Sequence, residues 1–353
     1  MKLKPIPLLR AAYLKTFVTV LHEAGVAVES ELNRDKLPTR LSEQADAYLP
    51  LLPALSFVHR MEQLRAIEDF GLVAGQRLTL RDLSAGLQRE LHQARTLDAA
   101  LKIACELAYT ENSHASYAMV SETNRLKLVS SLAIDAAVAG FRCGEWLHIM
   151  VLITIIRQVA GQAWCPTQIA FRSNVSPGAT AQEEFPSTRF LVGQPESFIV
   201  LPARLLGQVC RYSGDSPPSH TASVSAQDRA SMGPRDLSSS LLLALQAYLC
   251  DGHPPIQLAA ELAGTSVRTL QRQLRESGLS YTELLRRARF EAAARLFTDP
   301  DAKVVDIAYA LGYEDPSHFA RAFRRMVGIS PREFCTLRRR AYPLSPVAGS
   351  LSR

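Results

Sequence analysis

The chain contains few cysteines, and their spacing matches no common metal motif. Its six cysteines are scattered over 353 residues, without a CxxC pair and without a histidine cluster at ligand spacing. This pattern makes zinc sites and a disulfide framework poor explanations and is typical of the reducing cytosol. We therefore expect a cytoplasmic protein that needs no metal and no cofactor.

Long hydrophobic runs are also lacking. The longest nearly unbroken apolar run extends from Ile149 to Ile156, whereas a membrane-spanning helix needs roughly 20 residues. No long apolar stretch follows the lysines near the N-terminus, as it would in a secretory leader. The sequence predicts a protein with no membrane partner.

Motifs of the common enzyme classes are absent as well. The chain has no GxGxxG, P-loop, GxSxG or HExxH pattern, which are the local arrangements that cradle phosphates, expose a nucleophile or bind a catalytic zinc. His114, His148 and Cys165 could line a pocket, but structural or surface roles are favoured for them. Trp146 and Trp164 are expected in the core rather than in a ligand cage. We predict that the protein is not an enzyme.

Positive charge gathers in the last third of the chain. Residues 240–340 contain 15 lysines and arginines against 11 acidic residues, within a total of 40 against 34. This excess favours a polyanionic partner for the C-terminal part. This excess of basic residues is small, and a helical face that is merely solvated would have a similar excess.

The length and one biased segment divide the chain. A chain of this length predicts two domains, and residues 213–235 are rich in Ser, Pro, Gly and Ala without an apolar period, which is typical of a linker. The predicted parts are a regulatory domain at 1–212, this linker, a second domain at 236–340 and a flexible tail at 341–353.

The first domain is predicted to be α+β, with helices and a small antiparallel sheet or barrel. Apolar stripes at residues 8–24 and 55–70 indicate helices that end at Gly25 and Gly71. Alternating residues around 122–124 indicate a hairpin, and a buried helix is expected at 145–159. Three short strands are expected within 167–201.

The C-terminal part nearly repeats itself at a lag of 49 to 50 residues, as "QLAAELAGTSVRTLQRQLRESGLSYTEL" and "DIAYALGYEDPSHFARAFRRMVGISPREF". Each copy predicts a short apolar helix (256–262; 304–311), a turn, and a second helix capped by Ser266 or Asp315. This is the helix-turn-helix pattern, so the second domain is predicted to be all-α with two such units. The helix at 281–297 would hold them apart, and the "SYTE" and "SPRE" stretches predict capping boxes.

The second helix of each copy has two different faces. Apolar residues fall on one face at helical spacing, and polar or small residues fall on the other. The major groove of DNA accepts one such helix, and Arg and Gln can pair with guanine and adenine edges. The predicted DNA-facing residues are Arg268, Gln271, Arg272 and Arg275 in the first copy, and Ser317, Ala320, Arg321 and Arg324 in the second.

With these residues in view, the last hundred residues resemble the DNA-binding domain of the AraC/XylS family of bacterial transcription regulators, most closely through "IAYALGYEDPSHFARAFRRMVGISPREF". The resemblance implies a seven-helix domain that binds double-stranded promoter DNA and usually activates RNA polymerase. It places base-reading roles on Arg268, Gln271 and Arg272, and on Ser317, Ala320 and Arg321. Pro316 and Ala320 are poor hydrogen-bonding types, and Cys335 stands where the family often has an arginine.

The N-terminal half resembles, more loosely, the effector-binding domain of a subgroup of this family, including "WCPTQIAF" at 164–171. The resemblance implies a sensor for a small-molecule effector and allows a homodimer. The hypothesis is therefore a sequence-specific transcription regulator that acts as an activator and responds to a small molecule. The alternatives are a non-specific DNA-binding or nucleoid protein, and a ligand-binding protein without DNA sequence preference.

Overall fold

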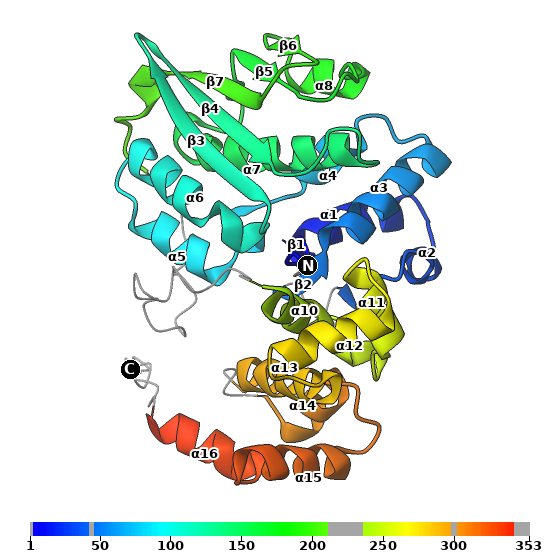
Figure 1. Ribbon diagram of the computed structural model, residues 1–353. Coiled ribbons are helices and arrows are strands. Elements are labelled where there is room, and N and C mark those ends of the chain that lie inside the picture. Colours follow the sequence, from blue (N-terminus) through cyan, green and yellow to red (C-terminus); the bar gives the residue numbers. More distant parts are fainter. Residues whose placement is uncertain (1–2, 42–45, 211–235, 298–301, 342–353) are drawn as a thin grey trace, which may run out of the picture.

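The computed structural model describes residues 3–41, 46–210, 236–297 and 302–341 and forms two lobes (Figure 1). The N-terminal lobe carries helices and all the strands of the described residues, and the C-terminal lobe is helical. This arrangement confirms the predicted fold class, an α+β region followed by an all-α region. The predicted linker and nearly all of the predicted tail lie outside the described residues.

The N-terminal lobe begins with a two-stranded antiparallel sheet of β1 (Leu8–Arg10) and β2 (Tyr48–Pro50). Its helical part surrounds a large hydrophobic core. The helices are α1 (Ala11–Glu23), α2 (Val28–Arg34), α3 (Leu51–Arg65), α4 (Phe70–Gln76), α5 (Ala85–Gln93), α6 (Leu97–Glu111), α7 (Phe141–Ala160) and α8 (Ala179–Glu184).

A five-stranded sheet covers one side of this core, in the order β3-β4-β7-β5-β6. Its strands are β3 (Ala115–Glu122), β4 (Arg125–Leu132), β5 (Gln168–Ala170), β6 (Arg189–Leu191) and β7 (Ser197–Pro202). The β3–β4 hairpin turns at 123–124 as predicted, and the three later strands are confirmed. The sheet is mixed, because β5 and β6 pair in parallel.

Helix α7 is the central helix of this lobe. By length and composition, α7 could cross a membrane, although the sequence predicted no apolar run of that length. However, 67% of its most apolar window is buried inside the protein. Helix α4 packs closely against it, because a Cβ on Gly71 would lie 2.6 Å from the Cα of Cys143. We conclude that α7 is a core helix.

Several predicted helix boundaries in this lobe are wrong, and two of them show why. The helix expected from Leu8 begins only at Ala11, because residues 8–10 pair with β2 instead. The helix expected to end at Gly71 ends at Arg65, where Ala66 adopts a left-handed conformation with φ of 47°. Gly71 lies inside α4, where it permits the contact with α7. Both errors arise because tertiary contacts, not local periodicity, set these boundaries.

The C-terminal lobe contains seven α-helices among its described residues, as the family resemblance implies. They are α10 (Leu237–Gln246), α11 (Ile256–Leu262), α12 (Val267–Glu276), α13 (Tyr281–Leu296), α14 (Val304–Ala310), α15 (Pro316–Val327) and α16 (Pro331–Ala341). Two hydrophobic clusters divide them, and α13 belongs to both: Leu284 and Ala288 pack in the first cluster, and Leu285 and Ala293 in the second. Helix α13 therefore joins the two halves, as the predicted spacer helix should.

The two lobes meet along the N-terminal segment. Ile6 and Leu8 are buried in the same cluster as α10 and α12 residues, and the backbone N–H of Ile6 donates to the Ser240 hydroxyl at 2.9 Å. A second contact lies beside α2, where the Tyr248 hydroxyl donates to the Lys36 carbonyl at 2.9 Å. The first residues of the chain thus complete the core of the C-terminal lobe.

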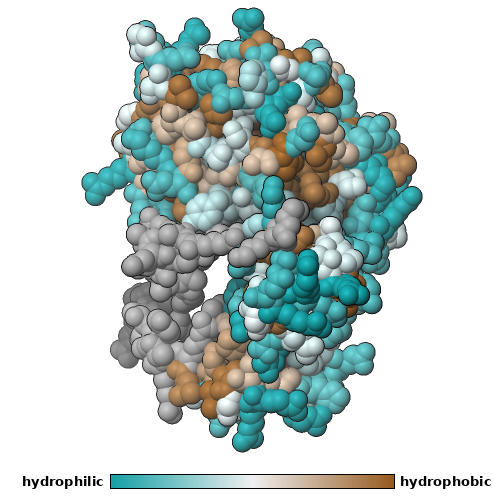
Figure 2. Space-filling view, in the orientation of Figure 1, coloured by the Kyte–Doolittle hydropathy of each residue, from teal (hydrophilic) through white to brown (hydrophobic). Residues whose placement is uncertain are grey.

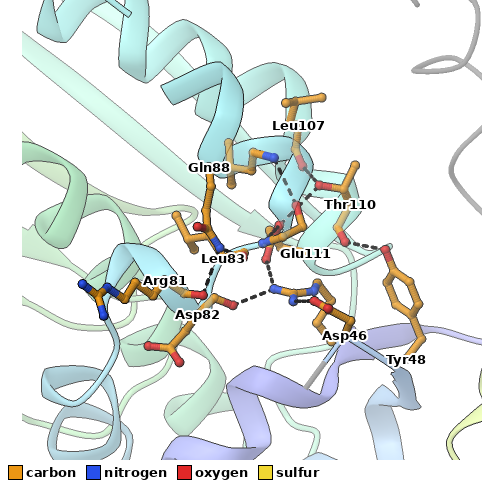
Figure 3. Close-up of polar contacts among 12 residues, drawn as sticks. Asp46, Tyr48, Arg81, Asp82, Leu83, Gln88, Leu107, Thr110 and Glu111 are labelled. Carbon is orange, nitrogen blue, oxygen red and sulfur yellow. Dashed lines mark hydrogen bonds and ion pairs between the residues drawn. The ribbon is translucent and has the colours of Figure 1, made fainter. Parts of the chain in front are cut away.

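A buried arginine holds β1 in place. Arg10 is 3% exposed, donates to the Asp82 carbonyl at 2.6 Å and to the Glu111 carboxylate at 3.1 Å, and also pairs with Asp46. Figure 3 shows Glu111 and Asp46 together with the hydroxyl of Tyr48. Burial lowers the pKa of Arg10, but the charges of Glu111 and Asp46 more than offset this, so the pKa is raised. The guanidinium stays charged and ties β1 to the end of α6.

We expect Glu111→Gln to destabilise the protein by about 3 kcal/mol, because it leaves a buried guanidinium whose remaining charged partner, Asp46, is 81% exposed. Urea unfolding followed by circular dichroism would measure the loss. The matched control is Glu196→Gln, which breaks the more exposed pair with Lys127 and should cost less than about 1 kcal/mol. Equal losses in both variants would contradict a structural role for the buried pair.

Candidate nucleic-acid interface

The first helix-turn-helix unit consists of α11 and α12. Helix α11 spans the predicted residues 256–262, and the turn contains Gly264 with φ of +61°. The Ser266 hydroxyl accepts a hydrogen bond from the Thr269 N–H at 3.2 Å and caps α12. This is the capping interaction that Ser at this position predicts.

Helix α12 has the two predicted faces. Leu270 and Leu274 are buried in the core of the first unit. The predicted outward residues are all exposed, namely Arg268, Gln271, Arg272 and Arg275. Of these, Arg272 lies near Glu276, with Nε 3.9 Å from the carboxylate. A separation of that size between exposed groups leaves the guanidinium free to exchange partners.

The sequence reading missed the role of Gln273 on the same helix. Its side chain is 9% exposed, and its Oε1 accepts a hydrogen bond from the Leu3 N–H at 3.4 Å. The N-terminal segment therefore touches the inner side of α12 while the opposite face stays in solvent. No sequence pattern could reveal this contact, because 270 residues separate its partners.

The second unit consists of α14 and α15. Asp315 caps α15 by accepting a hydrogen bond from the Ser317 N–H at 2.7 Å, which holds the pKa of its carboxyl below the ordinary value. Gly312 fits the turn with φ of +74°, and a Cβ there would lie 2.0 Å from the Leu249 carbonyl oxygen. The two units share their form, but the second turn is packed far more tightly than the first.

Helix α15 also presents the predicted faces. Phe319 and Phe323 are buried and contact each other with ring centroids 5.6 Å apart. Ser317, Arg321 and Arg324 are exposed, whereas Ala320 is half-buried. The aromatic residues anchor the helix to its own core, so that the arginines project into solvent.

The helices that follow each unit are capped differently from one another. Ser330 and Glu333 form the complete predicted box, since the Ser330 N–H donates to Glu333 at 2.8 Å and the Glu333 N–H donates to the Ser330 hydroxyl at 3.2 Å. At the start of α13, the Glu283 N–H donates to Ser280, but the Glu283 carboxylate accepts from Arg286 at 2.7 Å instead. The predicted "SYTE" box is therefore only half formed, because a neighbouring arginine competes for the carboxylate.

Hydrophilic side chains gather over α11 and α12 in the space-filling view (Figure 2). Together with the exposed arginines of α12 and α15, they give the C-terminal lobe a polar, basic surface on helices whose inner faces are apolar. Cys335, at the position where an arginine was expected, packs at the edge of the second hydrophobic cluster. It offers no cation to a phosphate.

Three further tryptophan and histidine residues take the following places. Trp146 is 1% exposed and packs against Phe171 with ring centroids 4.8 Å apart, so the core role is confirmed. His318 is exposed beside Asp315, with its Nε2 3.8 Å from the carboxylate. His148 is buried, where it contacts Asn112 at 3.1 Å and the Tyr117 hydroxyl at 2.9 Å, as in the favoured structural role, and it also lines a cavity.

An α+β region joined to paired, arginine-faced helix-turn-helix units defines the class of DNA-binding transcription regulators with an N-terminal sensor domain. Comparison with protein families agrees. The arabinose-binding domain of AraC transcription regulators matches residues 25–209, and a helix-turn-helix domain model matches residues 259–338. The first match alone covers more than half of the chain, and the chain belongs to the AraC/XylS family.

Some relatives match almost the whole chain, and others match only a short part of it. The ornithine utilization regulator of Pseudomonas aeruginosa is 23% identical over 345 residues, covering 93% of this chain and 96% of the relative. The transcriptional activator RhaS of Escherichia coli is 43% identical over 75 residues, covering 21% of this chain and 27% of the relative. The crystal structure of the regulator CdpR from Pseudomonas aeruginosa covers 88% of this chain and 96% of its own, with 18% identity and a TM-score of 0.37.

We expect Phe323→Ala to destabilise the second unit by about 3 to 5 kcal/mol, because it removes a ring that is 2% exposed and contacts Phe290, Phe297 and Phe334. Hydrogen exchange should show faster exchange of α14 and α15 amides, with α11 and α12 less affected. Tyr309→Ala is the matched control, since that ring is 50% exposed. Protection in α14 and α15 that matches the wild type would contradict the anchoring role.

Proposed function

We propose that this protein binds specific double-stranded promoter DNA through the outward faces of α12 and α15 and regulates transcription there. The DNA-facing residues are Arg268, Gln271, Arg272 and Arg275 in the first unit, and Ser317, Ala320, Arg321 and Arg324 in the second. The observation that carries the proposal is the exposure of arginines on both capped helices, each anchored by a buried apolar face.

The chemistry of these faces favours base reading over phosphate binding alone in the first unit. Arg can make paired hydrogen bonds to guanine, and Gln can do so to adenine. The second unit has Ala320 half-buried and Ser317 as a short polar side chain. We infer that α12 supplies most of the sequence preference and that α15 contributes more to backbone contacts.

We further propose that the protein is an activator that contacts RNA polymerase in the cytoplasm and is controlled by a small-molecule effector in the N-terminal lobe. Activation is supported by the name of RhaS, an activator that is 43% identical to this chain over 75 residues. Effector control is supported by the domain match and by the contact of the N-terminal segment with α10 and α12. The family resemblance also allows a homodimer. Measuring the mass of the protein in solution would test this.

We expect Arg272→Ala to weaken binding to a cognate promoter fragment by about 1 to 3 kcal/mol and to relax sequence preference, because it removes a base-reading guanidinium. Fluorescence anisotropy with the promoter fragment and a scrambled fragment would measure both effects. The control is Arg204→Ala, an exposed arginine of the N-terminal lobe, which should leave affinity unchanged.

A wild-type protein that binds both fragments equally, with a steep salt dependence, would support the non-specific alternative instead. A protein that binds neither fragment would overturn the DNA-binding proposal.

A further inference from the structure

The N-terminal lobe packs against the first helix-turn-helix unit. Ala247 and Tyr248, which follow α10, are buried in the hydrophobic core of the N-terminal lobe, and Leu258 and Leu262 of α11 pack against the same core. The second unit has its own hydrophobic cluster, which contains no residue of the N-terminal lobe among the described residues. Helices α15 and α16 lie at the end of the C-terminal lobe that is farthest from the N-terminal lobe (Figure 1). Apolar packing therefore ties the first unit, and not the second, to the N-terminal lobe.

Lys36, which follows α2, is the centre of a polar contact between the lobes. Its carbonyl accepts a hydrogen bond from the Tyr248 hydroxyl at 2.9 Å, and its ammonium group pairs with Glu261 of α11. The backbone of Lys36 is left-handed, with φ of 57°, a conformation that is unfavourable for residues that carry a side chain. Such a conformation persists where the surrounding contacts hold it, and it often marks a functional position. The strain at Lys36 supports a functional role for this contact.

Thr39 makes a second polar contact a few residues later. Its N–H donates to the Asp251 carboxylate at 3.0 Å, and its hydroxyl donates to the same carboxylate at 2.8 Å. Asp251 ends the short 3-10 helix η4 (Leu249–Asp251), which precedes α11, whereas Glu261 lies in the last turn of α11. Hydrogen bonds to an ionised carboxylate are stronger than those between neutral groups. Lys36 and Thr39 together thus hold the first unit just before α11 and at its end.

This docking leaves the proposed DNA-facing side of the first unit free. The side chains of that face remain exposed, namely Arg268, Gln271, Arg272 and Arg275. The N-terminal segment touches the inner side of α12, at Gln273. The N-terminal lobe therefore supports the unit from the sides that do not face the proposed DNA. A lobe that covered these arginines would inhibit DNA binding, whereas a lobe in this position can only hold the helix in place.

We propose that the N-terminal lobe positions α12 for base reading, and that Lys36, Thr39, Asp251 and Glu261 are positioning residues of DNA recognition. The proposal rests on the proposed function and adds that sequence preference depends on residues outside the DNA-binding lobe. A recognition helix held at a fixed angle keeps its paired hydrogen bonds to base edges aligned. A helix that is free to tilt loses this alignment but keeps its attraction to phosphates, which does not depend on sequence.

The test exchanges the charges of Lys36 and Glu261 in the full-length protein. Lys36→Glu places two carboxylates side by side, and Glu261→Lys places two ammonium groups side by side, so each single variant should loosen the contact. The double variant restores an ion pair of reversed direction. Hydrogen exchange without DNA should show α11 and α12 amides exchanging at least about twofold faster in each single variant. The double variant should exchange as the wild type does, and α14 and α15 should be unchanged in all three.

The second measurement is the ratio of the affinities for the promoter fragment and the scrambled fragment at one salt concentration. A changed charge alters both affinities alike, because attraction to phosphates is independent of sequence, so this effect cancels from the ratio. The ratio should fall at least about threefold in each single variant and recover in the double variant. Lys102→Glu is the matched control, because it breaks a similarly exposed pair with Asp98 inside the N-terminal lobe and should leave the ratio and the exchange unchanged.

The proposal is overturned if either single variant keeps the wild-type ratio, if the double variant fails to recover it, or if α14 and α15 are loosened as much as α11 and α12. A wild-type protein without preference between the two fragments would overturn the proposed function and with it the role in base reading. The exchange measurement contains no DNA, so it would still decide whether the contact holds the first unit.

Discussion

Strand β1 is the constraint on which the joining of the two lobes depends. It pairs with β2 along one edge, and Leu9 bridges to Asn112 along the other. Leu8 is buried with the C-terminal lobe, Leu9 lines the N-terminal cavity, and Arg10 is held by the buried Glu111. Three consecutive residues thus lie in three different environments, and the alternation of side chains along a strand accounts for the opposite placement of Leu8 and Leu9.

Helix α13 has the corresponding role inside the C-terminal lobe. Adjacent residues Leu284 and Leu285 pack into different hydrophobic clusters, so one helix fixes the position of both helix-turn-helix units. The cation of Arg289 lies 5.2 Å from the centre of the Tyr313 ring and ties the turn of the second unit to this helix. The outward arginines of α12 and α15 are thereby presented on a shared support rather than on independent domains.

The small cavity of the N-terminal lobe and the proposed DNA interface differ in how they use polar groups. The interface places long, charged side chains in solvent. These side chains lose their bound water only when a partner binds. The cavity places a neutral network of Asn112, His148 and Tyr117 at the end of an apolar space. A charged group is stable on the first kind of surface and costly in the second.

The sequence by itself determined the C-terminal lobe almost completely. The periodicity of Leu270 and Leu274, the caps at Ser266 and Asp315, and the near repeat of the unit are local features, so they fix helices and faces without knowledge of distant contacts. The Glu283 box failed only because Arg286, three residues away, competes for the same carboxylate.

Only the tertiary structure decided the place of β1, the cavity and the bond from Leu3 to Gln273. It also decided that Gly71 belongs inside α4, where the missing Cβ lets α7 approach. These features depend on residues that are far apart in the chain. Burial and close packing are set by the residues that lie opposite in space, and periodicity along one segment does not encode which residues those are.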